Sequence, residues 1–480
     1  MQWSRFFHKP QNVGPLPAPD TSGRAGGGCG DLIEIQLAFD GPVVADAAFL
    51  AKGCPGAIAG AAATASLLVG KTIYEAASLG IADIKTELGD IPPERESCLY
   101  LSEAALATAL EHYIGDPSVK LPVTGMTAVA MSGGVDSSLT ALRLLESGER
   151  LLGVTQRLHD FGRSGRRSCC TAADLEDARA VAALGGFPHF VLDMRDEFTD
   201  KVIRPFCDAY VAGQTPNPCV DCNRRLRWKR LLEGVGRLGA TSLATGHYAR
   251  ISDPDAGGRC VVKKALDPAK DQSYMFWAAP TAVLSRLLTP LGELTKEEVR
   301  EAAAELCLPV AEKADSQDVC FVPDGDYAGF VSRETGHVSR PGPIVNADGA
   351  RLGEHRGLIH YTIGQRRGLG VSAPKPLYVT GLDCRHNTVV VGERADLGVS
   401  RLTVYELNLI GEDSQESSFR AEVMLRYNGP SAAATIHRQE NDWATIEFDR
   451  PFGPAAPGQS AVFYDGELLL GGGIIKGTAT

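Results

Sequence analysis

The chain has 480 residues, 44% of them hydrophobic, and a formal net charge of −11 at pH 7. This length is too great for one ordinary hydrophobic core, so we expect two to four domains. The negative charge disfavours a protein that coats nucleic acid unselectively, but it allows a local basic groove, because phosphate binding depends on the charges at the contact.

Membrane and secretion signals are not evident in the sequence. Apolar stretches such as residues 57–69 are interrupted by Gly, Ala and Thr and fall short of a bilayer span. The first ten residues lack the apolar core and the cleavage site of a secretory signal. We therefore expect a cytoplasmic protein without a membrane partner.

Twelve cysteines are many for a cytosolic chain, in which reducing conditions prevent structural disulfides. They point instead to metal binding or sulfur chemistry. Four of them stand alone and are expected to be small buried hydrophobic residues, namely Cys207, Cys260, Cys307 and Cys384.

In chain order, residues 1–28 are rich in Pro and Gly and predict a flexible lead-in. Residues 29–120 form the first predicted domain. Alternating apolar residues at 33–37 indicate a strand and the Ala/Leu-rich stretch 99–110 a helix, so we expect an α+β unit. A Gly-Asp-Pro-Ser sequence at 115–118 predicts the linker that follows.

Residues 125–325 alternate short β-like runs with helical segments, which predicts a doubly wound α/β domain with a parallel sheet. The helical signal fades after about Asp324. Short β-like runs separated by Gly, Pro and Asn then indicate a small central domain at 326–400 and a terminal β-barrel at 401–480.

The sharpest local motif is Ala-Met-Ser-Gly-Gly-Val-Asp-Ser-Ser at 130–138, between an apolar strand and a helix. Glycines allow the backbone to approach phosphate closely, and hydroxyls and helix N–H groups donate to the anion. The motif lacks the Gly-Lys-Ser/Thr ending of a Walker loop, so transfer of the γ-phosphate is not its natural use.

This loop resembles the PP loop (pyrophosphatase-type) of enzymes that split ATP between the α- and β-phosphates and transfer AMP to an oxygen. Asp136 is expected to assist Mg²⁺ or pyrophosphate, since a carboxylate offers hard oxygen ligands. The loop alone leaves the subsequent nucleophile open between an amine and a sulfur.

Cys219 and Cys222 form a C-x-x-C pair. Five cationic residues follow them, which should lower the pKa of the two thiols and make them nucleophiles or metal ligands. A third cysteine, Cys320, lies almost a hundred residues further along the chain. The cationic residues are Arg224, Arg225, Arg227, Lys229 and Arg230.

Six motifs in order resemble those of the tRNA-specific 2-thiouridylase family, over roughly residues 126–475. Beyond the C-x-x-C segment at 215–223, they lie at 245–248, 270–274, 320–321, 361–370 and 457–464. The resemblance implies tRNAs for lysine, glutamate and glutamine as substrates, and a sulfur donor such as a cysteine desulfurase or a sulfur relay protein.

The resemblance also implies residue roles. Cys222 matches the family nucleophile and Cys320 the cysteine that carries a persulfide. The implied ATP contacts are Ala130, Met131, Ser132, Gly133, Gly134, Val135, Asp136, Ser137, Gln156 and Gly246. The implied tRNA contacts are Asn217, Pro218, Cys219, Lys270, Asp271, Gln272, Arg426 and Tyr427. His247, beside Gly246, is expected to lie near the ligand.

Cys219 stands where many relatives have Asp, and two mechanisms compete. In one, the terminal sulfur of a Cys320 persulfide attacks the activated uridine, and Cys222 releases it by forming a disulfide. In the other, Cys219, Cys222 and Cys320 bind a [4Fe-4S] cluster whose fourth iron holds an additional sulfide. The sequence favours the cluster slightly.

The first domain resembles NifU-type iron-sulfur scaffolds. Cys29, Asp31, Cys54 and Cys98 form a ligand set suited to an iron-sulfur cluster or zinc. Scaffolds commonly have His before the last cysteine, and this chain has Ser97, which puts ordinary cluster transfer in doubt.

Together these features predict ATP-dependent 2-thiolation of the wobble uridine of tRNA. An amidating synthetase acting on a small carboxylate is one alternative, and in it Cys222 and Cys320 would be dispensable. A cluster carrier with a vestigial ATP domain is the other, and in it Asp136 would be dispensable.

Overall fold

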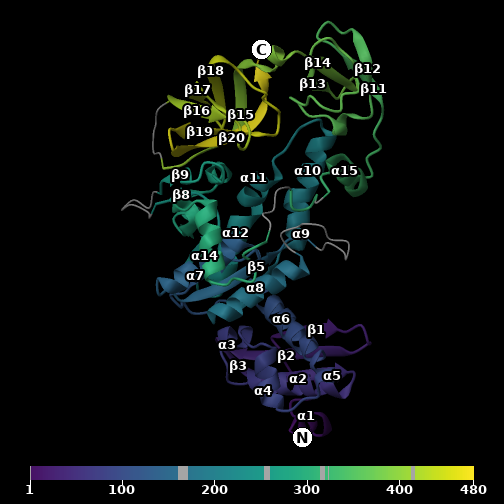
Figure 1. Ribbon diagram of the computed structural model, residues 1–480, viewed down its shortest axis with the longest axis vertical. Helices are drawn as coiled ribbons and strands as arrows, with labels where there is room; N and C mark the ends of the chain where they lie inside the picture. The colour runs from purple at the N-terminus through teal and green to yellow at the C-terminus, as the bar shows by residue number, and fades with distance from the viewer. Residues whose placement is uncertain are drawn as a thin grey trace.

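The computed structural model describes residues 2–159, 171–252, 260–313, 319–322, 324–411 and 417–479. Four parts follow one another along the chain (Figure 1): an N-terminal α+β part at one end, a parallel sheet in the middle, and two β-rich parts at the other end. This arrangement confirms the predicted fold class.

The N-terminal part is an antiparallel sheet in the order β1-β2-β3, covered by helices. Alternation explains its core, because Ile33, Ile35 and Leu37 of β2 are fully buried. The strands are β1 (Thr21–Gly26), β2 (Leu32–Asp40) and β3 (Val43–Lys52), and the helices are α1 (Trp3–His8), α2 (Pro55–Leu68), α3 (Ile73–Ala77), α4 (Ile81–Leu88), α5 (Pro93–Glu96) and α6 (Leu99–Gly115).

The prediction of a flexible lead-in at residues 1–28 is wrong. α1 packs against α2, and β1 pairs with β2 along its whole length. Gly23 of β1 lies so close to α6 that an added Cβ would be 2.1 Å from the backbone nitrogen of Ala109. Gly23, one of the glycines that suggested flexibility, is therefore required by close packing.

The middle part contains a five-stranded parallel sheet in the order β10-β7-β4-β5-β6. The order of the strands reverses at β4: β5 and β6 are added on one side of this strand, and β7 and β10 on the other. Ligands bind outside the carboxyl ends of the strands at such a switch point. The strands are β4 (Thr127–Ala130), β5 (Leu151–Arg157), β6 (His189–Asp193), β7 (Ser242–Thr245) and β10 (Leu287–Leu288).

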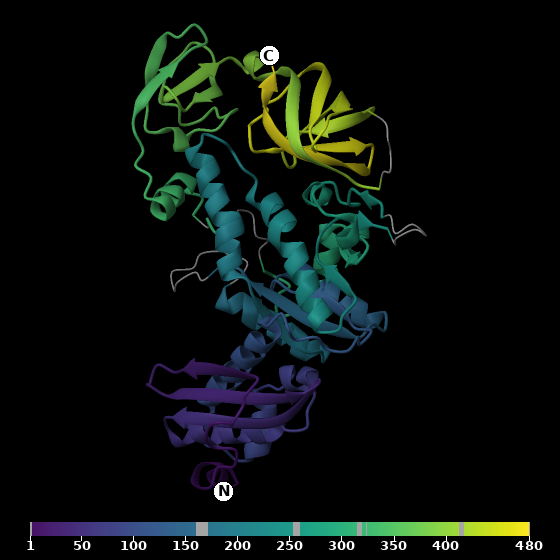
Figure 2. The same ribbon diagram turned by 180° about the vertical axis from the view of Figure 1, so that it is seen from behind.

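Helices α7 (Val135–Glu146) and α8 (Ala172–Gly185) follow β4 and β5. A long helical insertion separates β6 from β7 and reaches toward the β-rich parts, as Figure 2 shows. It comprises α9 (Arg195–Phe198), η1 (Thr199–Ile203), α10 (Arg204–Val211), α11 (Pro218–Cys222), η2 (Asn223–Arg227) and α12 (Trp228–Arg237). After β7 come β8 (Arg250–Ile251), β9 (Val262–Lys263), η3 (Ser273–Phe276), α13 (Thr281–Leu284), η4 (Pro290–Glu293) and α14 (Lys296–Glu305).

The helical signal does not end at Asp324, because α15 (Tyr327–Thr335) follows and packs on α10. Phe330 of α15 contacts Phe206 of α10 with ring centroids 6.5 Å apart. A four-stranded sheet in the order β12-β11-β14-β13 comes next. Its elements are β11 (Gly342–Val345), β12 (Arg351–His355), η5 (Leu358–His360), β13 (Tyr378–Asp383), β14 (Thr388–Gly392) and η6 (Arg394–Leu397).

The last part is a barrel closed by pairing of β15 with β20, in the order β15-β18-β17-β16-β19-β20. Closure removes the unpaired sheet edges that favour aggregation. The barrel also pairs with β9 of the middle part. Its strands are β15 (Val399–Leu409), β16 (Ser418–Met424), β17 (Ser431–Arg438), β18 (Ala444–Phe452), β19 (Ser460–Asp465) and β20 (Leu468–Ala479).

Two of the four isolated cysteines follow the prediction. Cys207 and Cys260 are buried, whereas Cys307 and Cys384 are exposed. Cys307 has a positive φ of 52° just beyond α14, and Cys384 lies beyond β13 with its Sγ 3.4 Å from the carbonyl oxygen of Ala212. Across the described ranges, every helix is too short or too polar to span a membrane.

The packing of β1 on α6 predicts that Gly23→Ala destabilises the protein. The added methyl group would overlap the α6 backbone, and we expect a loss of about 3 kcal/mol in the free energy of unfolding, the upper end of typical overpacking costs. Chemical denaturation measures the loss. Gly28→Ala is the control, because its Cβ would meet nothing within 4 Å. Equal stability of the two variants would contradict the packing of residues 21–26.

Candidate active site

The PP loop connects β4 to the N-terminus of α7, where Gly134 is the N-cap residue. Gly133 has a φ of +68°, and a Cβ on it would lie 2.1 Å from the carbonyl oxygen of Asp174 in α8. Only glycine satisfies both constraints. Within the loop, the backbone N–H of Ser132 donates to Ser137 Oγ at 3.2 Å. The strand, loop and helix thus place N–H groups where phosphate binds.

A cavity of about 570 Å³ opens in front of this loop. Most of the residues implied to contact ATP line this cavity, including Gln156 near the end of β5 and Gly246 after β7. Gly133 does not line it, because it faces α8. The implied ATP contacts that line the cavity are Ala130, Met131, Ser132, Gly134, Val135, Asp136, Ser137, Gln156 and Gly246.

Gly246 is the second glycine at which two backbone segments approach each other closely. A Cβ on it would lie 2.8 Å from both the carbonyl carbon of Asp136 and the backbone nitrogen of Ser137. The close approach presses the end of β7 against the first turn of α7. The switch point between β4 and β7 is therefore the floor of the cavity.

Asp136 is held by two donors. Its Oδ1 accepts hydrogen bonds from Lys296 Nζ at 2.6 Å and from the Tyr248 hydroxyl at 2.8 Å. Lys296 begins α14 and is 8% exposed. These contacts orient the carboxylate, whose oxygens suit Mg²⁺.

Lys313 is a cavity residue that sequence reasoning missed. Its Nζ donates to the Gly133 carbonyl at 2.8 Å and to the carboxylates of Asp174 and Asp177 at 2.6 Å each. Burial lowers the pKa of Lys313, but the two carboxylates outweigh that effect and the net shift is upward. No motif surrounds Lys313, so only the fold reveals its contact with the loop.

His247 lines the cavity, as expected for a residue near the ligand. Its Nδ1 lies 2.6 Å from Thr245 Oγ1, and its ring packs against both Trp228 and Phe276, which stack on each other. Burial, with a smaller effect of the Arg227 charge, lowers the pKa of His247 to about 3. The ring is therefore neutral near pH 7 and contributes shape and hydrogen bonding.

Three of the implied tRNA contacts line the same cavity, namely Lys270, Gln272 and Tyr427. Asp271 faces away, and its carboxylate accepts hydrogen bonds from the backbone N–H groups of Ala265 and Ser273. Arg426 is exposed on the surface. Tyr427 comes from the barrel, so the cavity lies between the middle part and the barrel.

The C-x-x-C pair lies on α11, which Asn217 caps by accepting from the N–H groups of Cys219 and Val220. Pro218 is buried at the first position of this helix. Cys222 is buried and Cys219 is exposed. Neither of these two cysteines is among the residues that line the cavity.

The cationic segment after Cys222 forms mainly ion pairs. Arg224 contacts Asp221 at 3.2 Å and also Glu406 of the barrel. Arg230 pairs with Glu197 at 2.8 Å and with Glu233 at 3.0 Å. Arg227 lines the cavity. The segment thus joins α11 to the barrel and offers Arg227 to the ligand.

Cys320 is half-buried, and the structure relates it to α11 through a shared neighbour. The adjacent Phe321 packs on Phe198 and Phe206, with ring centroids 5.7 and 5.1 Å apart. η1 lies between these two phenylalanines in the chain and contacts α11. The segments that carry Cys222 and Cys320 therefore pack on one helical run.

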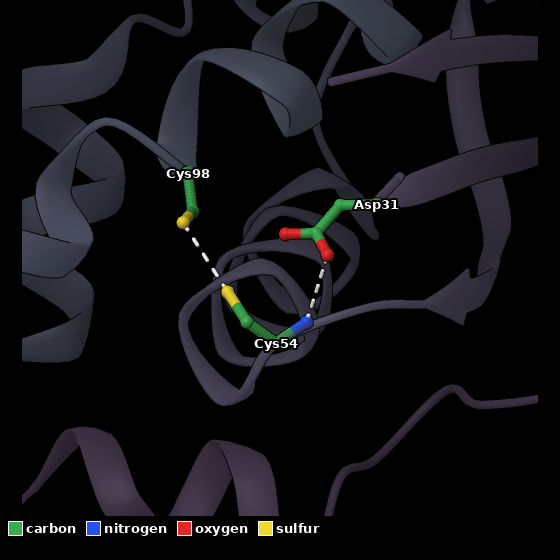
Figure 3. A group of neighbouring side chains, drawn as sticks. All are labelled: Asp31, Cys54 and Cys98. Carbon is green, nitrogen blue, oxygen red and sulfur yellow. Dashed lines mark hydrogen bonds between the residues drawn. The ribbon is translucent and has the colours of Figure 1, made fainter. Parts of the chain in front are cut away.

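A second cluster lies in the N-terminal part, where ligand atoms of Asp31, Cys54 and Cys98 all lie within 4.8 Å of one another (Figure 3). The Cys54 and Cys98 sulfurs are 3.3 Å apart, and the Cys54 N–H donates to Asp31 Oδ1 at 3.1 Å. Burial and the adjacent Cys54, Asp31 and Cys29 raise the pKa of Cys98 to about 11. Cys29 is exposed and Ser97 ends α5 beside the cluster.

The middle part and the two β-rich parts resemble domains of known proteins. Residues 126–324, 329–393 and 399–475 match the models of a tRNA methyl transferase HUP domain, a tRNA methyl transferase PRC-barrel domain and an aminomethyltransferase beta-barrel domain. The tRNA-specific 2-thiouridylase MnmA of Syntrophotalea carbinolica is 46% identical over 72% of this chain and 97% of its own length. The chain belongs to the tRNA-specific 2-thiouridylase family.

The N-terminal part also has relatives. Residues 3–119 match the model of the NifU-like N terminal domain. The bifunctional protein NifU/MnmA of Rubrobacter xylanophilus is 41% identical over 97% of this chain and 96% of its own length. The 2-thiouridylase family thus includes a relative with the same order of parts, and the predicted fusion is confirmed.

The contacts of Lys313 predict that Lys313→Met raises the KM for ATP. Loss of charge-assisted hydrogen bonds to the PP loop and to α8 typically corresponds to roughly a tenfold to hundredfold weaker interaction. Steady-state kinetics with varied ATP measures the change. Lys375→Met is the control, because Lys375 pairs with Glu393 at the surface of the central sheet. A KM for ATP equal to that of the control would contradict the assignment.

Proposed function

We propose that this chain uses ATP to convert the wobble uridine of tRNA into 2-thiouridine. The observation that supports it best is the shared cavity, in which the PP loop faces Lys270, Gln272 and Tyr427. The relative named as a tRNA-specific 2-thiouridylase supports a sulfur nucleophile over the amine of an amidating synthetase.

The proposed reaction has two steps. The 2-oxygen of uracil attacks the α-phosphorus of ATP, so that an O–P bond forms and pyrophosphate leaves. A sulfur nucleophile then attacks C2, and AMP leaves with the former 2-oxygen. The base must leave its stack to enter the cavity. The PP loop and Lys313 orient the phosphates, and Asp136 offers oxygen ligands for Mg²⁺.

Two sulfur carriers are compatible with the residue types. In the persulfide route, the terminal sulfur of Cys320 attacks C2, and the Cys222 thiolate takes the remaining Cys320 sulfur into a disulfide that a reductant must open. In the cluster route, Cys219, Cys222 and Cys320 would hold the [4Fe-4S] cluster, which would supply a sulfide. Cys219 and Cys222 are three residues apart on α11, so they share a helix face.

Cysteine variants test the proposal. Cys222→Ser and Cys320→Ser should abolish 2-thiouridine formation, measured by mass spectrometry of digested tRNA, while tRNA-dependent pyrophosphate release continues. Cys384→Ser is the control and should retain full thiolation, because this exposed cysteine follows β13 and matches none of the family's sulfur-carrying positions. Normal thiolation by either variant would contradict the assigned roles.

Anaerobic purification with absorption and Mössbauer spectra separates the two carriers. Cys219→Ala should remove both the cluster signal and thiolation if the cluster supplies sulfur. Full thiolation by iron-free protein would establish the persulfide route instead.

We further propose that Asp31, Cys54 and Cys98, with Cys29, hold a metal ion or an iron-sulfur cluster in the N-terminal part. The three ligand atoms within 4.8 Å suit one soft ion. Transfer of sulfur from a cysteine desulfurase or a relay protein, and tRNAs for lysine, glutamate and glutamine as substrates, complete the proposed function.

The raised pKa of Cys98 predicts a pH-dependent affinity for zinc. The ion must displace the thiol proton, so affinity should rise by up to about tenfold per pH unit for each proton released, at any pH below about 11. Competition titrations with a chelator measure the slope. Cys98→Ala should reduce the slope by one proton, whereas Cys307→Ala, at a distant exposed thiol, should not. An unchanged slope in Cys98→Ala would exclude Cys98 as a ligand.

A further inference from the structure

The N-terminal part is joined to the middle part by buried contacts along α6. Tyr74 donates its hydroxyl proton to the Leu238 carbonyl at 2.8 Å, and Arg237 Nε donates to the Ile114 carbonyl at 3.0 Å. Tyr74 also packs edge-on against Phe190 of β6. The hydrophobic core runs continuously across this contact. In Figure 1, α6 lies directly beneath the central sheet.

Glu111 and Arg157 form a charge pair across the interface. Glu111 of α6 is 6% exposed, and its Oε1 lies 3.1 Å from Nη1 of Arg157. Burial raises the pKa of Glu111, and the Arg157 charge opposes that rise. A carboxylate so deeply buried depends on its partner, because an unpaired buried charge is strongly unfavourable.

Arg157 is also part of the cavity's framework. It is the last residue of β5, and its neighbours Gln156 and Leu158 both line the ATP cavity. Successive side chains of a strand point to opposite faces, so the Arg157 side chain faces away from the cavity and reaches Glu111 behind it. The Arg157 carbonyl accepts from the Met194 N–H at 2.9 Å, which ties the same point to the end of β6.

We infer that the N-terminal domain is a structural component of the ATP site, in which Glu111 is a positioning residue that holds Gln156 and Leu158 through Arg157. This inference rests on the proposed binding of ATP in the cavity. It assigns the fused domain a role that is independent of any metal bound by Cys54 and Cys98. The domain acts on the nucleotide site through α6 even when its cysteines are empty.

The test is the variant Glu111→Gln, which keeps the size of the side chain and removes its charge. We expect the KM for ATP to rise by roughly fivefold to tenfold, within the range of coupling between linked sites, with the KM for tRNA unchanged. Glu34→Gln is the matched control. Glu34 is 7% exposed and pairs with Arg24 at 2.6 Å inside the N-terminal part, without a partner in the parallel-sheet part among the described ion pairs.

Further measurements keep the outcomes distinct. Glu111→Gln in metal-free protein should show the same rise, whereas metal-free wild-type protein should keep the KM for ATP of metal-loaded wild-type protein. An unchanged KM for ATP in a folded Glu111→Gln protein overturns the inference, and so does an equal rise in Glu34→Gln. Thermal unfolding establishes folding.

If Glu111→Gln does not fold, the exchanged pair Glu111→Arg with Arg157→Glu should restore both folding and the KM for ATP. A folded exchanged protein with a raised KM for ATP would overturn the inference. Direct titration of wild-type protein with a fluorescent ATP analogue distinguishes failure of the inference from failure of the proposed function. If wild-type protein does not bind the analogue, the proposed function itself is refuted.

Discussion

The structure depends on close backbone packing around the PP loop. Gly133 touches the first turn of α8, and Gly246 touches the first turn of α7, at distances that leave no room for a Cβ. These contacts bring three segments from distant parts of the chain to the carboxyl edge of β4. Because the donors are backbone N–H groups, their direction is fixed by the fold and needs no reorganisation when the anion binds.

Two lysine ammonium groups contact the PP loop, although the chain as a whole is acidic. Lys296 and Lys313 both contact loop residues and are themselves held by Asp136, Asp174 and Asp177. Arginines after Cys222 are paired with acidic residues of the insertion and the barrel. This pairing limits unselective attraction of RNA, so that entry to the cavity depends on shape and on local contacts.

The fusion places two cysteine-containing sites in one chain, with the parallel sheet between them (Figure 1). α6 begins next to Cys98 and ends at the contact with Arg237. Its 17 residues correspond to a length of about 25 Å, so Cys98 and the Arg237 contact lie at opposite ends of the helix. The buried contacts of α6 make the two parts one continuous body. The N-terminal domain therefore packs directly on the parallel-sheet part and is not a separate domain on a linker.

The sequence by itself determined the order of the parts, the parallel sheet, the PP loop and the cysteine motifs, because short-range periodicity and local motifs encode them. Tertiary structure alone decided that residues 2–28 are folded and that Asp271 faces away from the cavity. It also decided that Lys313 contacts the PP loop and that Glu111 pairs with Arg157. Strand β1 is recognisable only by its pairing with β2 and its packing on α6. Lys313 and Arg157 contact residues more than forty positions away in the sequence. Local sequence patterns cannot predict such long-range contacts.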